Sequence, residues 1–190
     1  METKKIIITG GATRIGAAIA KSLVGYDTKM VIHFNKSKSS ALKLKKELDE
    51  LGAETYLLKA DLNNFKQTNS LIRIAHNKMK GLNCLINNAS IFENDNLENF
   101  SEKSFTKHIN INLKAPAILT QNFKKVMKDR EGCIVNIIDQ RVEKLTPFFF
   151  SYTLSKSSLA ILTKTSAMKL APNIRVNGIS PGPTLKNKRQ

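Results

Sequence analysis

The sequence predicts an α/β protein with a doubly wound parallel sheet, in three layers with helices on both faces. Short β-branched runs alternate along the chain with longer segments of helical period. A turn that contains Gly10 and Gly16 joins the first strand to the first helix. Strands that are separated by helices run parallel, and right-handed crossovers then place helices on both faces of the sheet.

The expected elements alternate regularly, without an internal repeat, a low-complexity tract or a linker. Strands are expected at residues 5–9, 30–34, 55–59, 84–87, 133–138 and 175–179. Helices are expected at residues 14–25, 37–51, 64–80, 101–129 and 151–170. With 190 residues, 41% of them apolar, the chain is expected to form one domain, 1–190, around one core.

Composition narrows the classes of protein. No apolar run approaches the roughly 20 residues that cross a bilayer, and the N-terminus lacks a signal-peptide layout, so we expect a cytoplasmic protein without a membrane partner. The two cysteines fit neither a metal-ligand nor a disulfide pattern, and no metal is expected. The net charge of +16 comes mostly from scattered lysines rather than from a basic stripe with stacking aromatics, which argues against nucleic-acid binding.

The first turn is a candidate phosphate site. It follows a strand and opens a helix, so backbone amides and the positive helix end are expected to face a ligand at the sheet edge. A pyrophosphate fits such a turn, although glycine also simply closes tight turns. The second strand ends without the carboxylate that would bind a ribose 2′-hydroxyl. Asn35, Lys36 and Ser37 stand there instead and suit a 2′-phosphate, which favours NADPH; the alternative is a polar loop with Ser37 as a helix cap.

Tyr152 and Lys156 are the strongest catalytic candidates. Their spacing places both side chains on one face of a helix. A neighbouring ammonium favours a phenolate, so we expect Lys156 to lower the pKa of Tyr152 toward neutrality. Asp139 is the third candidate, because a carboxylate after an apolar run is seldom there without a partner. The chemistry indicated is proton donation to a group that also receives a hydride.

With these motifs the chain resembles the short-chain dehydrogenase/reductase family, whose members have a Rossmann fold, over essentially all 190 residues. The match comprises the turn from Thr9 to Gly16, Asp61, the Asn87, Asn88 and Ala89 segment, Asn112, Tyr152 with Lys156, Arg175 to Asn177, and Pro181 with Gly182. The resemblance implies that Asn112, Tyr152 and Lys156 are catalytic, and Asp139 completes the expected catalytic set. With the residues above, the expected cofactor site is Gly10, Arg14, Ile15, Gly16, Asn35, Lys36, Ser37, Asp61, Leu62, Asn88, Ala89, Ser90, Tyr152, Lys156, Pro181 and Gly182.

Three departures from the usual family pattern concern the substrate. Arg14 replaces a glycine, Asp139 replaces the catalytic serine, and Ser90, Ile91 and Phe92 follow the Asn-Asn-Ala segment. Together they resemble pteridine reductases and dihydromonapterin reductases. That resemblance implies that Arg14 reaches the cofactor phosphates and the pterin, that Asp139 acts with the tyrosine, and that Phe92 stacks on the pterin. The expected substrate site is Arg14, Ser90, Phe92, Asp139 and Tyr152.

The chemistry of the Asp139 carboxylate supports a pterin substrate independently of the resemblance. A serine hydroxyl can donate to a ketone oxygen, whereas an ionised carboxylate only accepts, so Asp139 suits a substrate with N–H donors such as a dihydropterin. The predicted activity is an NADPH-dependent reduction of a C=N bond of a dihydropterin, with Tyr152 as proton donor. The alternatives are a reductase of ketones or acyl-carrier substrates, or a non-catalytic NADP-binding remnant. For Phe92 the alternative is a core aromatic.

The C-terminus bears on whether the protein is a non-catalytic NADP-binding remnant. The chain stops soon after Pro181 and Gly182, where family members usually continue through a substrate-covering helix and a last strand. We therefore expect a C-terminally incomplete domain that lacks both elements. The resemblance implies a homo-oligomer, a dimer or tetramer, if the C-terminal part exists.

Overall fold

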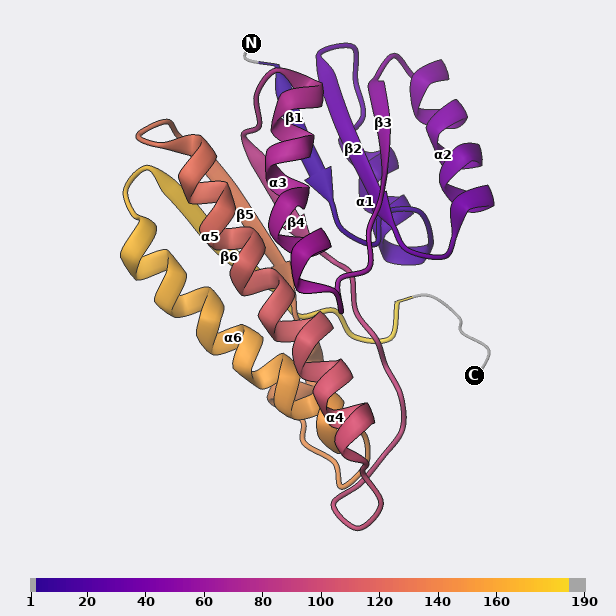
Figure 1. Ribbon diagram of the computed structural model, residues 1–190, viewed down its shortest axis with the longest axis vertical. Helices are drawn as coiled ribbons and strands as arrows, with labels where there is room; N and C mark the ends of the chain where they lie inside the picture. The colour runs from indigo at the N-terminus through magenta and orange to yellow at the C-terminus, as the bar shows by residue number, and fades with distance from the viewer. Residues whose placement is uncertain (1–2, 185–190) are drawn as a thin grey trace.

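The structure, a computed structural model, describes residues 3–184 and shows a six-stranded, wholly parallel sheet (Figure 1). The strands lie in the order β3-β2-β1-β4-β5-β6. They are β1 (Lys4–Ile8), β2 (Thr28–Phe34), β3 (Glu54–Lys59), β4 (Cys84–Asn87), β5 (Gly132–Ile137) and β6 (Ile174–Ile179). The predicted fold class is confirmed, and each predicted strand differs by at most two residues at an end.

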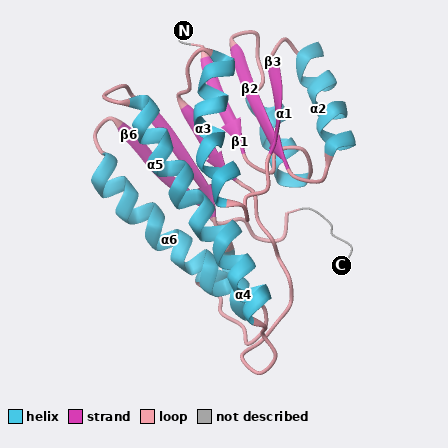
Figure 2. Ribbon diagram, viewed as in Figure 1, coloured by secondary structure: helices cyan, strands magenta, loops and turns pink. Residues whose placement is uncertain are grey.

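The helices join successive strands (Figure 2). They are α1 (Arg14–Leu23), α2 (Lys38–Glu50), α3 (Phe65–Met79), α4 (Glu102–Ile109), α5 (Ala115–Met127) and α6 (Phe150–Leu170). The helix expected at 101–129 contains a π-helical turn, η1 (Asn110–Lys114), between α4 and α5. A short 3-10 helix, η2 (Gln140–Val142), precedes α6. π-Helical turns are rare and often mark functional sites.

The core has two layers because neighbouring residues of a strand point to opposite faces. On one face, Ile7, Val31 and Leu85 pack in a cluster with α3 and α5. On the other face, Ile6, Ile8 and Met30 pack with α1 and α2. Figure 1 shows α3, α5 and α6 side by side over the first face. With both faces covered, β1 and β2 are almost continuously apolar, as buried parallel strands are.

A series of hydrogen bonds between buried polar side chains crosses the core and joins β4, β5 and α6. The Asn87 amide donates to Asn136 at 2.8 Å, and the Asn136 amide donates to the Thr163 hydroxyl at 2.8 Å. Thr163 in turn donates to the Leu159 carbonyl at 2.7 Å. Buried amides with partners fix how elements meet, because an unpaired one would be costly. These hydrogen bonds fix α6, which carries Tyr152, against the sheet. Within residues 3–184 no helix is long and apolar enough to span a membrane.

Candidate functional site

A cavity of about 830 Å³ lies at the carboxyl edge of the sheet, where the loops after all six strands meet. Most predicted site residues line it: Gly10, Arg14, Ile15, Gly16, Asn35, Asp61, Leu62, Asn88, Ala89, Ser90, Phe92, Asp139, Tyr152, Lys156, Pro181 and Gly182. Lys36 and Ser37 lie beside this lining, and Asn112 is buried behind it. A second hollow, at the start of β2 and β3, contains none of the predicted residues.

The glycine turn is packed too closely for side chains. A Cβ atom on Gly16 would lie 2.5 Å from the Gly10 carbonyl oxygen and 2.6 Å from the Asn88 amide nitrogen. That amide donates to the Thr9 and Gly10 carbonyls at 2.9 and 3.1 Å. The Thr9 hydroxyl accepts from the Asn88 and Ala89 N–H groups, both at 3.0 Å. The end of β4 therefore holds the turn in shape.

His33 holds the same turn from the side of β2. The Gly10 N–H donates to His33 Nδ1 at 3.1 Å, so Nε2 carries the proton and donates to the Ala60 carbonyl at 3.1 Å. Burial lowers the pKa of His33 to about 4, which keeps the imidazole neutral. The Gly11 N–H donates to the His33 carbonyl at 3.0 Å. The expectation that the turn's amides face a ligand is wrong for these two glycines, because both N–H groups bind His33.

Arg14 begins α1 with a φ of 51°, in the left-handed region. This conformation costs a residue with a side chain about 1 kcal/mol or more and favours glycine, which explains why a glycine is usual at this point of the family pattern. The Arg14 side chain is exposed and lines the cavity. The strain lies at the positive end of α1, where a guanidinium can reach an anion.

The ends of β2 and β3 form the far end of the cavity. Asn35 and Lys36 are exposed, and Ser37, at the start of α2, makes no side-chain capping bond within the described chain. Ser37 therefore stands at the N-cap position of α2, as the alternative expects, but without a side-chain capping bond. After β3, Asp61 accepts from the Asn63 N–H at 3.0 Å and lines the cavity with Leu62.

At the other end of the cavity, the Tyr152 hydroxyl donates to Asp139 at 2.7 Å. Tyr152 is buried, and both this burial and the hydrogen bond to Asp139 raise its pKa. The positive charge of Arg141 and, to a smaller extent, the Ser90 hydroxyl act on this pKa in the opposite direction. The expectation of a more acidic phenol is wrong, because Tyr152 faces a carboxylate rather than the ammonium. The phenol keeps its proton and can serve as a donor.

The Lys156 side chain lies beside the Tyr152 ring and is buried in the protein. Its ammonium lies 5.8 Å from the centre of the Tyr152 ring and donates to the Ile137 carbonyl at 2.8 Å. Only 2% of the residue is exposed, and burial lowers its pKa to about 8, while Asp139 opposes that shift. The same helical face brings both residues together as predicted. The ammonium remains largely charged at neutral pH although the residue is almost fully buried.

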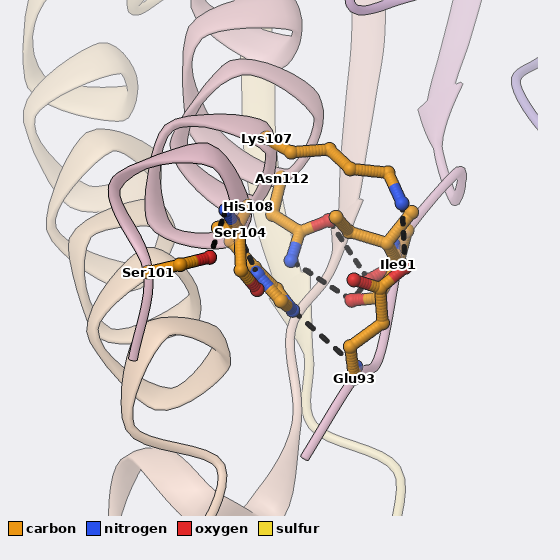
Figure 3. A network of polar contacts seen from close by, with 8 residues as sticks. Ile91, Glu93, Ser101, Ser104, Lys107, His108 and Asn112 are labelled. Atoms are coloured by element: carbon orange, nitrogen blue, oxygen red, sulfur yellow. Dashed lines mark hydrogen bonds and ion pairs between the residues drawn. The ribbon is translucent and has the colours of Figure 1, made fainter. Parts of the chain in front are cut away.

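Asn112 lies inside η1 and is fully buried (Figure 3). Its amide oxygen accepts from the Ile91 N–H at 2.9 Å and from the Ser90 hydroxyl at 3.1 Å. Its amide nitrogen donates to the Ile91 carbonyl at 3.1 Å and to the Ser155 hydroxyl at 3.0 Å. The side chain thus connects the loop after β4 with α6, so it contributes to the shape of the site from behind the cavity wall.

Phe92 belongs to an aromatic stack rather than to the core. Its ring lies 4.2 Å from that of Phe149, with 5° between the planes, and meets the Tyr152 ring edge-on at 4.7 Å. The Arg141 guanidinium lies over both phenyl rings, 5.4 Å from Phe92 and 4.7 Å from Phe149. Phe92 and Arg141 line the cavity, whereas Phe149 does not. Phe149 therefore supports the aromatic wall from outside the cavity.

Sequence reasoning missed several residues that build this site. His33 lies within the second predicted strand, but only its contacts with Gly10 and Ala60 identify its role. Arg141 follows Asp139 by two positions, and that proximity was the available signal. Phe149 gave no local signal, because its partner Phe92 is far away in the sequence.

Fold and cavity together define an α/β protein with a nucleotide-type turn at one end of the cavity and a Tyr–Lys pair at the other. The short chain dehydrogenase family matches residues 4–189, and the chain therefore belongs to this family of oxidoreductases. A crystal structure of FolM alternative dihydrofolate reductase 1 from Brucella suis in complex with NADP has a TM-score of 0.92 and 40% identity, covering 98% of this chain and 75% of that one.

Two curated proteins show more distant similarity. An uncharacterised oxidoreductase of Methylorubrum extorquens is 29% identical over 183 residues, which are 96% of this chain and 73% of its own length. The 3-oxoacyl-(acyl-carrier-protein) reductase of Synechocystis sp. is 28% identical over 178 residues, 93% of this chain and 72% of its own.

Proposed function

We propose that the protein is an NADPH-dependent reductase that transfers a hydride to a C=N bond of a dihydropterin. The observation that carries this proposal is the carboxylate of Asp139 at hydrogen-bond distance from the Tyr152 hydroxyl, in a cavity walled by Phe92. The similarity to the FolM protein, whose name describes an alternative dihydrofolate reductase, supports the same substrate class.

The residues of the cavity fit NADPH. A pyrophosphate would lie in the cavity at the start of α1, where Gly10 and Gly16 carry no side chains and the helix dipole favours negative charge. Lys36 supplies a cation, and Asn35 and Ser37 supply polar groups, where a 2′-phosphate would lie. Asp61 and Leu62 would hold the adenine. Asn88, Ala89, Ser90, Pro181 and Gly182 would border the nicotinamide half, whose ribose Lys156 would bind.

When bound, NADPH supplies the hydride. Tyr152 holds a proton at its hydroxyl and, because its pKa is raised, delivers it to the substrate nitrogen only as negative charge develops there. Asp139 orients the phenol and accepts from ring N–H or amino groups of the substrate. Lys156 places positive charge beneath the phenol and favours the phenolate that forms. Asn112 fixes the loop between Ser90 and Ile91 against α6.

The aromatic wall favours a flat substrate. Phe92 is held by Phe149 behind it and by the Tyr152 ring beside it, so it meets a ligand with little loss of side-chain freedom. A pterin ring would stack on Phe92, and Arg14 would reach the same ligand from α1. Because Arg14 keeps a strained backbone conformation, its guanidinium is the feature we expect to matter for binding.

A carbonyl reductase is the second candidate, favoured by the Ser90 hydroxyl. This hydroxyl acts on the Tyr152 phenol and could donate to a ketone oxygen in place of the usual serine if it exchanges its bond to Asn112. The similarity to a 3-oxoacyl-(acyl-carrier-protein) reductase is consistent with that chemistry.

Steady-state NADPH oxidation with a dihydropterin and with a simple ketone separates the two candidates. The wild type is expected to reduce the dihydropterin at a kcat/KM at least about a hundredfold above that for the ketone. Asp139→Ser is expected to lower this preference, because it restores a donor for a carbonyl oxygen. Asp139→Asn removes the charge and replaces one acceptor oxygen with an N–H donor at nearly the same size, so it is expected to lower the preference as well. A wild type that prefers the ketone would refute the dihydropterin proposal.

The cofactor preference has its own test. The double variant Lys36→Ala, Ser37→Ala is expected to weaken NADPH binding about tenfold and leave NADH binding unchanged, since only NADPH carries the 2′-phosphate. Lys38→Ala, on the neighbouring exposed position, is the matched charge control. Equal effects on both cofactors would remove these residues from the 2′-phosphate site.

A further inference from the structure

The segment that carries Phe92 has no regular secondary structure, yet it is fixed at both ends. Asn112 binds the backbone N–H and carbonyl of Ile91 at 2.9 and 3.1 Å. Three residues after Phe92, the Asp95 side chain accepts from the Ser151 N–H at 3.0 Å, one residue before Tyr152 in α6. The backbone of Glu93 lies between these two fixed points.

His108 of α4 provides the middle anchor (Figure 3). Its Nδ1 lies 2.9 Å from the Ser104 carbonyl, which can only accept, so Nδ1 carries the proton. Its Nε2 lies 3.3 Å from the Glu93 N–H, which can only donate, so Nε2 is the acceptor. The two partners therefore define one neutral tautomer. The residue is 0% exposed, so no water replaces either partner.

The same imidazole also faces the catalytic end of the cavity. Its ring lies 6.4 Å from the Tyr152 ring, at 76° between the planes. Phe92 directly precedes Glu93, and its ring also contacts the Tyr152 ring edge-on. A second tie between the same elements, the Lys107–Glu93 ion pair at 2.5 Å, is about half exposed and contributes little by comparison.

We propose that His108 is a positioning residue: its imidazole fixes the Glu93 backbone and thereby the distance of the Phe92 ring from Tyr152. The inference rests on the proposed role of Phe92 as the wall on which the substrate stacks. His108 itself lies outside the cavity lining, so we expect it to contact neither cofactor nor substrate. Its loss should therefore affect substrate binding far more than cofactor binding.

The test compares two replacements of similar size. His108→Leu fills the space but removes the acceptor, whereas His108→Gln can still place an amide oxygen near the Glu93 N–H. Hydrogen exchange of the 91–95 segment is expected to be about tenfold faster in His108→Leu and within threefold of wild type in His108→Gln. The KM for a dihydropterin is expected to rise about tenfold in the Leu variant, with the Kd for NADPH unchanged. Lys107→Ala, which removes only the exposed ion pair, should match wild type in all three readouts.

Wild-type exchange and KM in His108→Leu would overturn the proposal. So would a Gln variant as impaired as the Leu variant, or an equal loss of NADPH and substrate binding. If His108→Leu does not fold, His108→Asn makes the same comparison, because its shorter amide can reach Ser104 but not Glu93. The exchange measurement needs no substrate, so inactivity of the wild type on dihydropterins would refute the proposed function while the exchange result still decides the role of His108.

Discussion

The two ends of the cavity differ in whether backbone or side chains form the wall. Around Gly10 and Gly16 the wall is mostly backbone, and close approach of chain segments determines its shape. Around Tyr152 the wall consists of side chains from the loops after β4 and β5, from η2 and from α6 that hold one another through hydrogen bonds and ring contacts. A backbone site leaves a sequence signature, since glycine has few substitutes. A side-chain network depends on residues that meet only in the folded protein.

Removal of the proposed proton donor at the side-chain end should have the largest effect. Tyr152→Phe is expected to lower kcat by about a thousandfold, because general acid catalysis contributes about that much, while the Kd for NADPH stays within twofold of wild type. Steady-state kinetics and cofactor titration measure the two effects. A variant that keeps more than a tenth of the wild-type kcat would show that another group supplies the proton.

Acid should disrupt the backbone end through His33. Its pKa falls from 6.5 to about 4 on folding. The unfolded state therefore binds the proton more readily, and the stability that is present above pH 6.5 is lost as the pH falls toward 4. The expected loss from this residue is about 3 kcal/mol. Urea unfolding between pH 7 and 4 should show a smaller loss in His33→Gln, and identical pH profiles would exclude His33 as the cause.

A methyl group in the turn should damage the same end without a change of charge. Gly16→Ala places a Cβ within 2.5 Å of a backbone carbonyl, and we expect a loss of about 2 kcal/mol of unfolding free energy and weaker NADPH binding. Gly25→Ala is the matched control, because its Cβ would meet only the Thr28 hydroxyl at 3.8 Å. Equal stability of the two variants would show that the turn tolerates a side chain.

The smallest expected effect is a gain. Arg14→Gly relieves the positive φ and should raise the unfolding free energy by about 1 kcal/mol, while NADPH or substrate binding weakens. Arg14→Ala keeps the strain and removes the guanidinium, so it should weaken binding without the gain in stability. If neither variant alters the Kd for NADPH or the KM for a dihydropterin, the guanidinium has no role in binding.

Much of the molecule could be predicted from local patterns. The β-branched runs located all six strands, because buried parallel strands are apolar along their whole length. The glycines located the turn, and the spacing of Tyr152 and Lys156 located the helical face that both share. The loops after the strands then had to meet at one edge, as parallel topology requires.

The charge state and the supports of the site were beyond such patterns. Spacing alone suggested that Lys156 would acidify Tyr152, but the fold brings Asp139 to the phenol and turns the ammonium toward the Ile137 carbonyl. His33, His108 and Phe149 were likewise undetectable as supports, because each acts on a segment distant in sequence. The sequence by itself determined the order of the elements and the edge where the site forms, and it supplied the candidate reactive groups, since these follow from periodicity and residue chemistry. Only the tertiary structure decided which groups touch, and contact and burial set pKa values, tautomers and side-chain positions.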